Sequence, residues 1–421
     1  MLDMPTDPVF KFRTVPMRYG VGILREIGYD LTNLGIKNCM IITDKHMTED
    51  TKIIEQTKAS IEEQGLEVNI WNETEAEPSA SSIQKGIEYA STMEFNGIVA
   101  IGGGSAIDTA KAINLYTSYP ADFYDYFSPP IGKGMKIPGT LKPLVAVPTT
   151  SDTGSETTGV SIVSFPDRKL KYGLSNEYLV PRLAIIDPLT AITMPPSVTA
   201  NTGMDALMHA IEAFTSIPFY AKPKPKTPLE RSIYQGANPI SDALSIASIE
   251  SIGKYLLPAY ANGNDIEARS KMHLASHIAG LAFGNAGVHI PHALSYPLAG
   301  ECLERGINLP HGLAVTITGP ATMRVIAPYL HERCITIASL LGENANGIPL
   351  LEMSFKAAEV LVKLMKALDL PSGISELGIV KSDLADLAEK ALLQKRVLAQ
   401  SPIFVNKKLL ERILKESLQY W

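Results

Sequence analysis

One carboxylate and one imidazole stand four residues apart in a helix-favouring part of this chain. Asp205 and His209 lie in the segment 203–213, which is rich in Ala, Leu, Met and Ile. Residues four apart share one face of a helix. This segment is therefore predicted to present a carboxylate and an imidazole together.

Two further histidines lie beside turn-forming residues. His292 follows Pro291, and His311 lies between Pro310 and Gly312. Because proline disfavours the interior of regular elements, both imidazoles are expected at helix starts or turns. Three imidazoles and one carboxylate suit iron(II) or zinc and leave a position for a substrate oxygen. The alternative is that each histidine is an ordinary helix or loop residue whose ring nitrogens are hydrogen-bonded within the protein.

A glycine-rich turn earlier in the chain could bind phosphate. The buried-strand pattern at 97–101 runs directly into the glycines of 102–105, and 106–114 then has a helical pattern. Glycine allows a sharp turn and a close approach, and the N–H groups that begin the next helix attract a pyrophosphate. Ser105 could also cap that helix. The alternative is an ordinary turn.

Two more polar segments follow predicted strands. Asp44 ends the strand pattern at 39–43, where its carboxylate could accept hydrogen bonds from an adenosine ribose and favour NAD over NADP. Alternatively, Asp44 caps a helix or is an acidic residue in a turn. The hydroxyl-rich turn 148–156 follows the strand pattern at 144–147. We expect both at the carboxyl edge of one sheet, where ligands bind in such folds.

The elements that must position these residues change in kind along the chain. The first half alternates short apolar runs with helical patterns at 51–65 and 79–94, as βαβ units around a parallel sheet do. From residue 196 onward nearly every segment has a helical pattern. At 421 residues the chain is longer than one hydrophobic core usually supports, so two domains are expected. We therefore predict an α/β, NAD-binding domain at 1–197 with a parallel sheet, followed by an all-α, metal-binding domain at 198–421.

Composition restricts the partners. The net charge of -6 argues against nucleic acid, which needs a concentrated basic surface. The three cysteines have no CxxC spacing, so neither a disulfide framework nor a cysteine zinc site is indicated. This cysteine usage fits a protein of the reducing cytoplasm. The first eight residues lack a basic stretch followed by an apolar one, and no run reaches the ~18 apolar residues of a membrane span. We expect a cytoplasmic protein with a small-molecule substrate and no membrane partner.

Two other features have competing interpretations. The segment 221–228 alternates lysine and proline and cannot be helical. It is either a solvated surface loop or a basic lid over an acidic substrate. His273 and His277 form a second pair four residues apart, but no acid completes them. We interpret both as packing or supporting residues.

At 102–111, 148–156, 203–213 and 310–312 the chain resembles the iron-containing (group III) alcohol dehydrogenase family. Four motifs in the family's order are far more specific than any one alone. The resemblance implies the two-domain, dehydroquinate synthase-like architecture, with NAD and iron(II) as cofactors. It implies the metal ligands Asp205, His209, His292 and His311. It implies cofactor contacts at Asp44, Gly102, Gly103, Gly104, Ser105, Asp108, Thr149, Thr150 and Lys171.

Within that family, 234–242 and 283–297 look most like the hydroxyacid-oxoacid transhydrogenase branch, which passes hydride between 4-hydroxybutyrate and 2-oxoglutarate. The expected enzyme is a metal-dependent, NAD-linked alcohol oxidoreductase, by default a homodimer. A general short-chain alcohol dehydrogenase or aldehyde reductase is the alternative, with zinc as the alternative metal. The rivals from other classes are a lyase-type carbocycle synthase that uses NAD transiently and a non-catalytic metal or dinucleotide binder.

The chain departs from the family's pattern at two positions. Tyr296 stands where many alcohol-oxidising members carry a further histidine that relays the proton, so water or Tyr296 itself would have to do so. Asp152 stands where the family usually has glycine, and it places a negative charge near the expected pyrophosphate.

Overall fold

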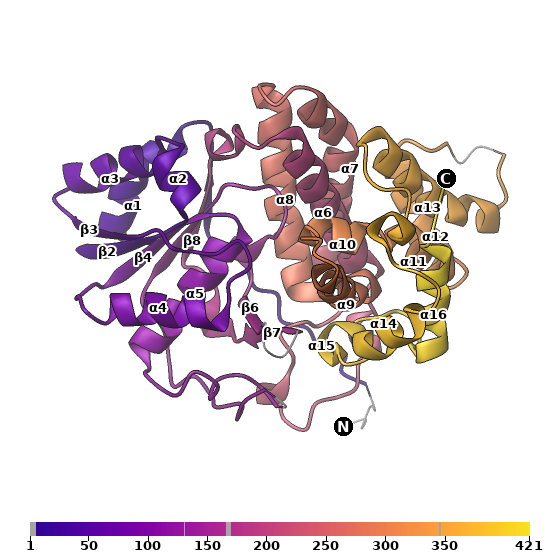
Figure 1. The fold of residues 1–421 in the computed structure, drawn as a ribbon, viewed down its shortest axis with the longest axis horizontal. Coiled ribbons are helices and arrows are strands. Elements are labelled where there is room, and N and C mark those ends of the chain that lie inside the picture. Colours follow the sequence, from indigo (N-terminus) through magenta and orange to yellow (C-terminus); the bar gives the residue numbers. More distant parts are fainter. Residues whose placement is uncertain (1–5, 130, 166–169, 345–346) are drawn as a thin grey trace. The chain divides into compact units, whose positions relative to one another are not determined.

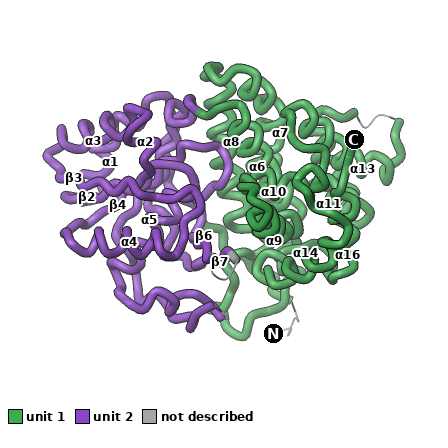
Figure 2. The backbone as a smooth tube through the Cα atoms, in the orientation of Figure 1, with its two compact units in different colours: residues 1–13, 194–421 green, residues 14–193 purple. Residues whose placement is uncertain are grey.

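The computed structural model describes residues 6–129, 131–165, 170–344 and 347–421 (Figure 1). Its chain divides into two compact units (Figure 2). Residues 14–193 form the first, an α/β unit. Residues 194–421, joined by the N-terminal segment, form the second, which is helical.

The α/β unit is built on a six-stranded parallel sheet in the order β1-β8-β5-β4-β2-β3. Its strands are β1 (Met17–Tyr19), β2 (Asn38–Ile42), β3 (Glu67–Trp71), β4 (Gly97–Gly102), β5 (Leu144–Pro148) and β8 (Leu183–Ile186). Its helices are α1 (Ile27–Asn33), α2 (Lys45–Glu49), α3 (Ile53–Glu63), α4 (Ala80–Ala90) and α5 (Gly104–Ser118). A separate antiparallel hairpin consists of β6 (Val160–Phe165) and β7 (Leu170–Ser175).

Alternate side chains of the central strands enter two different cores. On β4, Val99 packs with Ile27 and Ile61 on one face, whereas Ile98 packs with Ile107 and belongs to the core on the other. The strand is buried along its whole length. Burial on both faces explains why such strands appear in the sequence as continuous apolar runs.

The predicted α/β fold with a parallel sheet is confirmed, and the strands expected at 39–43, 97–101 and 144–147 correspond to β2, β4 and β5. The β6–β7 hairpin was not foreseen. It follows the hydroxyl-rich turn in the chain, and its first strand packs on α5.

The helical unit is arranged around one long buried helix, α6 (Pro196–Thr215), which packs against α7, α8 and α10. Its other helices are α7 (Pro239–Ala261), α8 (Ile266–Ala286), α9 (Ile290–Glu304), α10 (His311–Thr316), α11 (Gly319–Ile326), α12 (His331–Leu340), α13 (Leu350–Ala367), α14 (Leu384–Ala391), α15 (Lys395–Leu398) and α16 (Lys407–Glu416). Helix α6 is apolar around most of its circumference. The few charged side chains that it buries therefore need partners inside the core.

The N-terminal segment 6–13 packs with the helical unit, although the sequence prediction grouped residues 1–197 together. The backbone N–H of Lys11 donates to Gln235 at 2.6 Å, and that of Arg13 donates to Asn285 at 2.7 Å. These partners lie more than 200 residues away along the chain, so local sequence gives no sign of the attachment. The change from one unit to the other at residues 193 and 194 lies near the expected boundary at 197.

Among the described helices, none combines the length and hydropathy that a bilayer-crossing segment needs. The three cysteines are buried and none forms a disulfide. Burial raises the pKa of Cys39 and of Cys334 to about 12, which keeps both thiols protonated at neutral pH.

Candidate functional site

Helix α6 places three ionisable side chains on one face. Asp205, His209 and Glu212 follow one another at the i, i+4 and i+7 positions, and all three are buried. An Asp205 carboxylate oxygen lies 3.8 Å from His209 Nδ1. The predicted helical pair is therefore present in the structure, and a second carboxylate extends it by one turn.

Helix α9 supplies the next imidazole. The helix begins at Ile290 and Pro291, and His292 lies in its first turn. His292 Nε2 is 3.0 Å from His209 Nε2, and the two ring centroids are 4.6 Å apart. The possible donor atoms of Asp205, His209 and His292 all lie within 4.8 Å of one another. The structure thus brings three of the four predicted ligands together.

Glu212 was not among the predicted site residues. Its Oε1 is 2.6 Å from His292 Nδ1, and its Oε2 accepts the backbone N–H of His289 at 2.5 Å. His289 precedes α9, so Glu212 satisfies an N–H at the start of that helix and also fixes the ring of His292. The i+7 spacing from Asp205 was the sequence signal that could have identified this carboxylate.

The pKa values of this pair follow from burial and mutual charge. Burial disfavours the charged form of Glu212, but the charge and hydrogen bond of His292 outweigh it and lower the carboxyl pKa. Burial likewise disfavours the imidazolium of His292, but Glu212 outweighs it and raises the imidazole pKa, with Asp205 adding to the effect and Arg396 opposing it. Glu212 therefore remains an anion inside the core.

His311 is the first residue of α10, and its ring centroid lies 5.6 Å from that of His292. It lies next to the group of three donors without being one of them. Gly312 explains how α10 comes so near to α6. A Cβ atom on Gly312 would lie 2.2 Å from the Asn201 carbonyl oxygen and 3.0 Å from the Asp205 Cβ. Only glycine allows this approach.

The other residues considered for this site lie on α8 and α9. Tyr296 is one helical turn after His292 and is half-buried. His273 and His277 are buried on α8 and are not part of the three-donor group. Phe283, also on α8, stacks on the His209 ring at a centroid distance of 4.2 Å. Helix α8 thus limits how the His209 ring can turn.

The donor set fits a divalent metal ion. Two imidazole Nε2 atoms lie 3.0 Å apart, so that one ring must donate to the other unless both bind one ion. The Nδ1 atom of His292 is already engaged by Glu212, which leaves its Nε2 for a metal. Two imidazoles and a carboxylate, all buried, suit iron(II) or zinc better than magnesium or calcium.

The predicted nucleotide residues gather at the carboxyl edge of the sheet in the α/β unit. Gly102 ends β4 with a φ of 153°, a backbone angle that favours glycine. A Cβ there would lie 2.6 Å from the Ala106 Cβ and 3.5 Å from Asp44 Oδ2. Asp44 caps α2, since its Oδ1 accepts the Met47 N–H at 3.0 Å. One carboxylate oxygen therefore serves the helix and the other lies beside the glycine turn.

Ser105 does not cap α5, and that expectation was wrong. Gly103 is the N-cap, and Ser105 is the second residue of the helix, where its hydroxyl donates to the Ala76 carbonyl at 2.5 Å. The hydroxyl-rich turn lies against the same glycines. A Cβ on Gly103 would be 3.4 Å from Thr150 Oγ1, and one on Gly104 would be 2.6 Å from a Thr153 methyl carbon.

Asp108 is buried beneath this turn. Its Oδ1 accepts the Ser155 hydroxyl at 2.5 Å, and its Oδ2 accepts the Ile162 N–H at 2.8 Å. The ammonium group of Lys111 donates to the Ser155 carbonyl and hydroxyl, each at 2.7 Å. Asp108 and Lys111 thus hold the hydroxyl-rich turn and the start of β6 in place.

The remaining predicted contacts also lie near this edge. The Thr149 N–H donates to the Gly102 carbonyl at 3.0 Å, which joins the turn to β4. Lys171 on β7 forms an ion pair with Glu77. The Thr150 hydroxyl donates to Asp152 at 2.6 Å, and burial raises the pKa of the Asp152 carboxyl. Asp152 therefore lies next to a predicted cofactor contact, as the sequence suggested.

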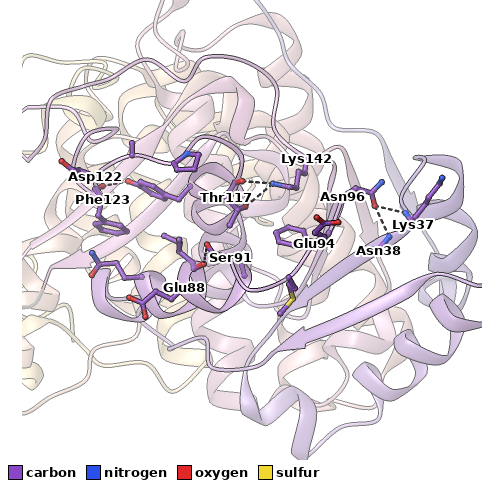
Figure 3. Close-up of a pocket in the computed structure, with 18 residues that line it drawn as sticks. Lys37, Asn38, Glu88, Ser91, Glu94, Asn96, Thr117, Asp122, Phe123 and Lys142 are labelled. Carbon is purple, nitrogen blue, oxygen red and sulfur yellow. Dashed lines mark hydrogen bonds between the residues drawn. The ribbon is translucent and has the colours of Figure 1, made fainter.

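A hollow of about 960 Å³ lies at the opposite, amino edge of the sheet (Figure 3). Its walls include Asn38 at the start of β2, Asn96 just before β4 and Lys142 just before β5. None of the predicted site residues lines it. Ligands of such sheets bind at the carboxyl ends of the strands, so this hollow is not the predicted nucleotide site.

Comparison with known proteins relates both units to one family. Residues 15–188 match the family described as iron-containing alcohol dehydrogenase, and residues 229–418 match its C-terminal domain. The chain is 39% identical to the mitochondrial hydroxyacid-oxoacid transhydrogenase of Mus musculus over 99% of its own length and 91% of that protein. The chain belongs to the iron-containing alcohol dehydrogenase family.

Solved structures of this family have the same fold. A 1,3-propanediol oxidoreductase superposes with a TM-score of 0.87 at 29% identity, over 97% of this chain and 100% of the other. The sulfoacetaldehyde reductase of Bifidobacterium kashiwanohense, solved in complex with NAD+, superposes with a TM-score of 0.82 at 26% identity. The match covers 98% of this chain and 99% of the other. The predicted class, an NAD-linked, metal-dependent alcohol oxidoreductase, is thereby confirmed.

Proposed function

We propose that this family member is a metal-dependent hydroxyacid-oxoacid transhydrogenase, which moves hydride from a hydroxyacid such as 4-hydroxybutyrate to an oxoacid such as 2-oxoglutarate through bound NAD. The observation that carries the proposal is the 39% identity to a transhydrogenase along almost the whole of both chains. The buried carboxylate-imidazole group on α6 and α9 supports it, because it has the donors that such chemistry needs.

The helical unit would hold the metal at Asp205, His209, His292 and His311. A divalent ion supplies a Lewis acid for the substrate oxygen, and NAD supplies the hydride carrier. Asp205 contributes anionic charge, and the stacked Phe283 keeps His209 in orientation. Glu212 holds the proton on His292 Nδ1, so that its Nε2 faces the donor group.

The α/β unit would hold NAD at its carboxyl edge. Asp44 would bind the adenosine ribose, and the backbone of 102–105 at the start of α5 would bind the pyrophosphate. Thr149, Thr150 and Lys171 would complete the contacts. Asp108 would act through Ser155, by shaping the hydroxyl-rich turn. This gives the domains near 1–197 and 198–421 the separate tasks expected of them.

Tyr296 would take part in the proton relay. It stands one turn beyond His292 on α9, where its phenol could pass the proton of the substrate hydroxyl directly or through water. The neighbouring Ser295 is less suited, because its hydroxyl donates to the His292 carbonyl at 2.8 Å.

The remaining expectations concern assembly and compartment. We expect a homodimer in the cytoplasm that binds neither nucleic acid nor membranes. The three buried thiols are consistent with a reducing compartment. The mouse relative is named a mitochondrial protein. Fractionation of cells that produce the protein, together with its mass in solution, tests both expectations.

The test is an anaerobic assay of iron-loaded protein with 4-hydroxybutyrate. One reaction receives 2-oxoglutarate and no added NAD, and another receives NAD alone. Turnover with 2-oxoglutarate alone supports a transhydrogenase that retains its cofactor. Turnover only with added NAD would make the protein a dehydrogenase, and no turnover in either reaction would favour the general alcohol dehydrogenase, which simple alcohols would then test.

A further inference from the structure

The short helix α15 packs directly on the part of the fold that carries the metal-ligand candidates. Its Val397 shares a buried cluster with Ala293 and Phe283. Ala293 follows His292 in sequence, and Phe283 stacks on the His209 ring. Helix α15 therefore packs against residues that adjoin the two imidazoles.

Arg396, the residue before Val397, carries a positive charge into this region. Its guanidinium carbon lies 5.2 Å from the centroid of the buried Tyr234 ring. Helix α15, on which Arg396 stands, packs against α9, the helix that carries His292. Arg396 is half-buried, so its field is screened less than that of a surface arginine.

A second cation reaches the same tyrosine from the lysine- and proline-rich segment. The ammonium group of Lys222 donates to the Tyr234 carbonyl at 2.6 Å and to the Gln400 side chain at 2.8 Å. Both acceptors are uncharged, and burial lowers the pKa of Lys222 to about 8. Lys224 and Lys226 of the same segment are exposed. The segment is therefore mostly surface loop, and of its lysines only Lys222 is turned inward.

Two cations thus lie at Tyr234, and the helix that carries one of them, α15, packs on the helix that carries His292. We propose that Arg396, supported by Lys222, forms the subsite that binds the carboxylate of the hydroxyacid and oxoacid substrates. This inference rests on the proposed function, because both substrates of such a transhydrogenase carry a carboxylate and a simple alcohol carries none. The guanidinium of Arg396 can donate two parallel hydrogen bonds to one carboxylate. Lys222, whose ammonium group already binds neutral oxygens, adds positive potential and holds the wall of the subsite.

Replacement of Arg396 tests the assignment through substrate discrimination. In Arg396→Gln, kcat/KM for 4-hydroxybutyrate should fall about 10-fold to 100-fold, the loss expected for a charged hydrogen bond, whereas kcat/KM for uncharged 1,4-butanediol changes little. Arg396→Lys should recover part of the loss. The matched control is Lys395→Gln, which removes the exposed neighbouring cation and should leave both substrates unaffected. Parallel losses with both substrates, or no loss, would overturn the assignment.

A binding measurement separates this inference from the proposed function. Calorimetric titration of metal-loaded wild type and Arg396→Gln with 2-oxoglutarate needs no turnover. At least about tenfold weaker binding in Arg396→Gln, with unchanged metal content and melting temperature, supports the subsite. Equal affinity in both proteins, or no binding by the wild type, overturns it. If Arg396→Gln does not fold, Arg396→Lys gives the comparison. Failure of the transhydrogenase proposal would instead appear in wild-type turnover.

Discussion

Glu212 Oε1 lies 2.6 Å from His292 Nδ1, and both side chains are buried. The carboxylate belongs to α6 and the imidazole to α9, so one contact joins the two helices that carry the candidate metal ligands. The second oxygen of Glu212 accepts the His289 N–H just before α9. Glu212 therefore fixes both the ring and the helix on which the ring stands.

Glu212→Gln should weaken metal binding. Glutamine keeps an oxygen at this position but loses the charge that polarises His292, and loss of such a supporting contact typically costs about 10-fold to 100-fold in metal affinity. The measurement is metal content and affinity by competition with a chelator. His292→Ala, which removes the ring itself, serves as the positive control, and Glu250→Gln on the exposed side of α7 serves as the neutral one. Unchanged affinity in Glu212→Gln would show that the contact only stabilises the fold.

Gly312→Ala should destabilise the helical unit. Its Cβ would lie 2.2 Å from the Asn201 carbonyl oxygen, so α10 and α6 must move apart at a cost of about 1–3 kcal/mol. Thermal unfolding measures the loss, and metal content should fall with it because Asp205 adjoins the contact. Gly300→Ala is the matched control: nothing lies within 4 Å of a Cβ there, and the change should stabilise α9 by about 0.4–1 kcal/mol. Similar melting temperatures for the two variants would contradict this interpretation.

Asp152→Gly should tighten NAD binding. Asp152 lies next to Thr150, a predicted cofactor contact, and its ionised form would repel the cofactor's phosphates. We expect a roughly threefold to tenfold lower Kd, the size of a partly screened charge interaction. Calorimetry measures it, and Asp152→Asn removes the charge while keeping an acceptor for the Thr150 hydroxyl. If only Asp152→Gly binds more tightly, backbone freedom rather than charge is responsible, and if neither does, the repulsion is absent.

Stability should depend on pH through Lys222. Its pKa is lowered from 10.5 to about 8 by burial, so the unfolded chain binds more protons than the folded one between these values. The free energy of unfolding of the wild type should therefore rise from pH 8 to pH 10.5, relative to Lys222→Met, which cannot titrate. Chemical denaturation across this range measures the difference. Lys222→Arg keeps the cation and should also lack the rise. A constant difference between wild type and Lys222→Met would contradict the buried position.

The sequence predicted those parts of the site that depend on local spacing. Asp205 and His209 could be paired because four residues span one helical turn, and Gly102 because a buried strand ends there. The i+7 spacing puts Glu212 on the same helix face, but it does not reveal the role of Glu212, since an acid on a helix is usually solvated. Its role depends on a helix that begins 78 residues later, at Ile290. Local spacing likewise says nothing of Arg396, which is brought to α9 only because α15 packs on that helix.

The misassigned details have physical reasons as well. Ser105 looked like a helix cap because serine is a preferred N-cap, but α5 begins earlier, at Gly104, and the hydroxyl finds the Ala76 carbonyl instead. The edge strand β1 is short, and both edge strands, β1 and β3, are partly exposed, so they lack the continuous apolar run that marks β4 and β5. The attachment of residues 6–13 to the helical unit depends on backbone hydrogen bonds, which do not require particular side chains of that segment.

The most direct test of the transhydrogenase proposal follows the hydride itself. Metal-loaded protein would be given 4-hydroxybutyrate deuterated at carbon 4, together with unlabelled 2-oxoglutarate and no added NAD. The proposal predicts that deuterium appears at carbon 2 of the 2-hydroxyglutarate product, as detected by mass spectrometry. Product without deuterium, or no product unless NAD is supplied, would contradict it.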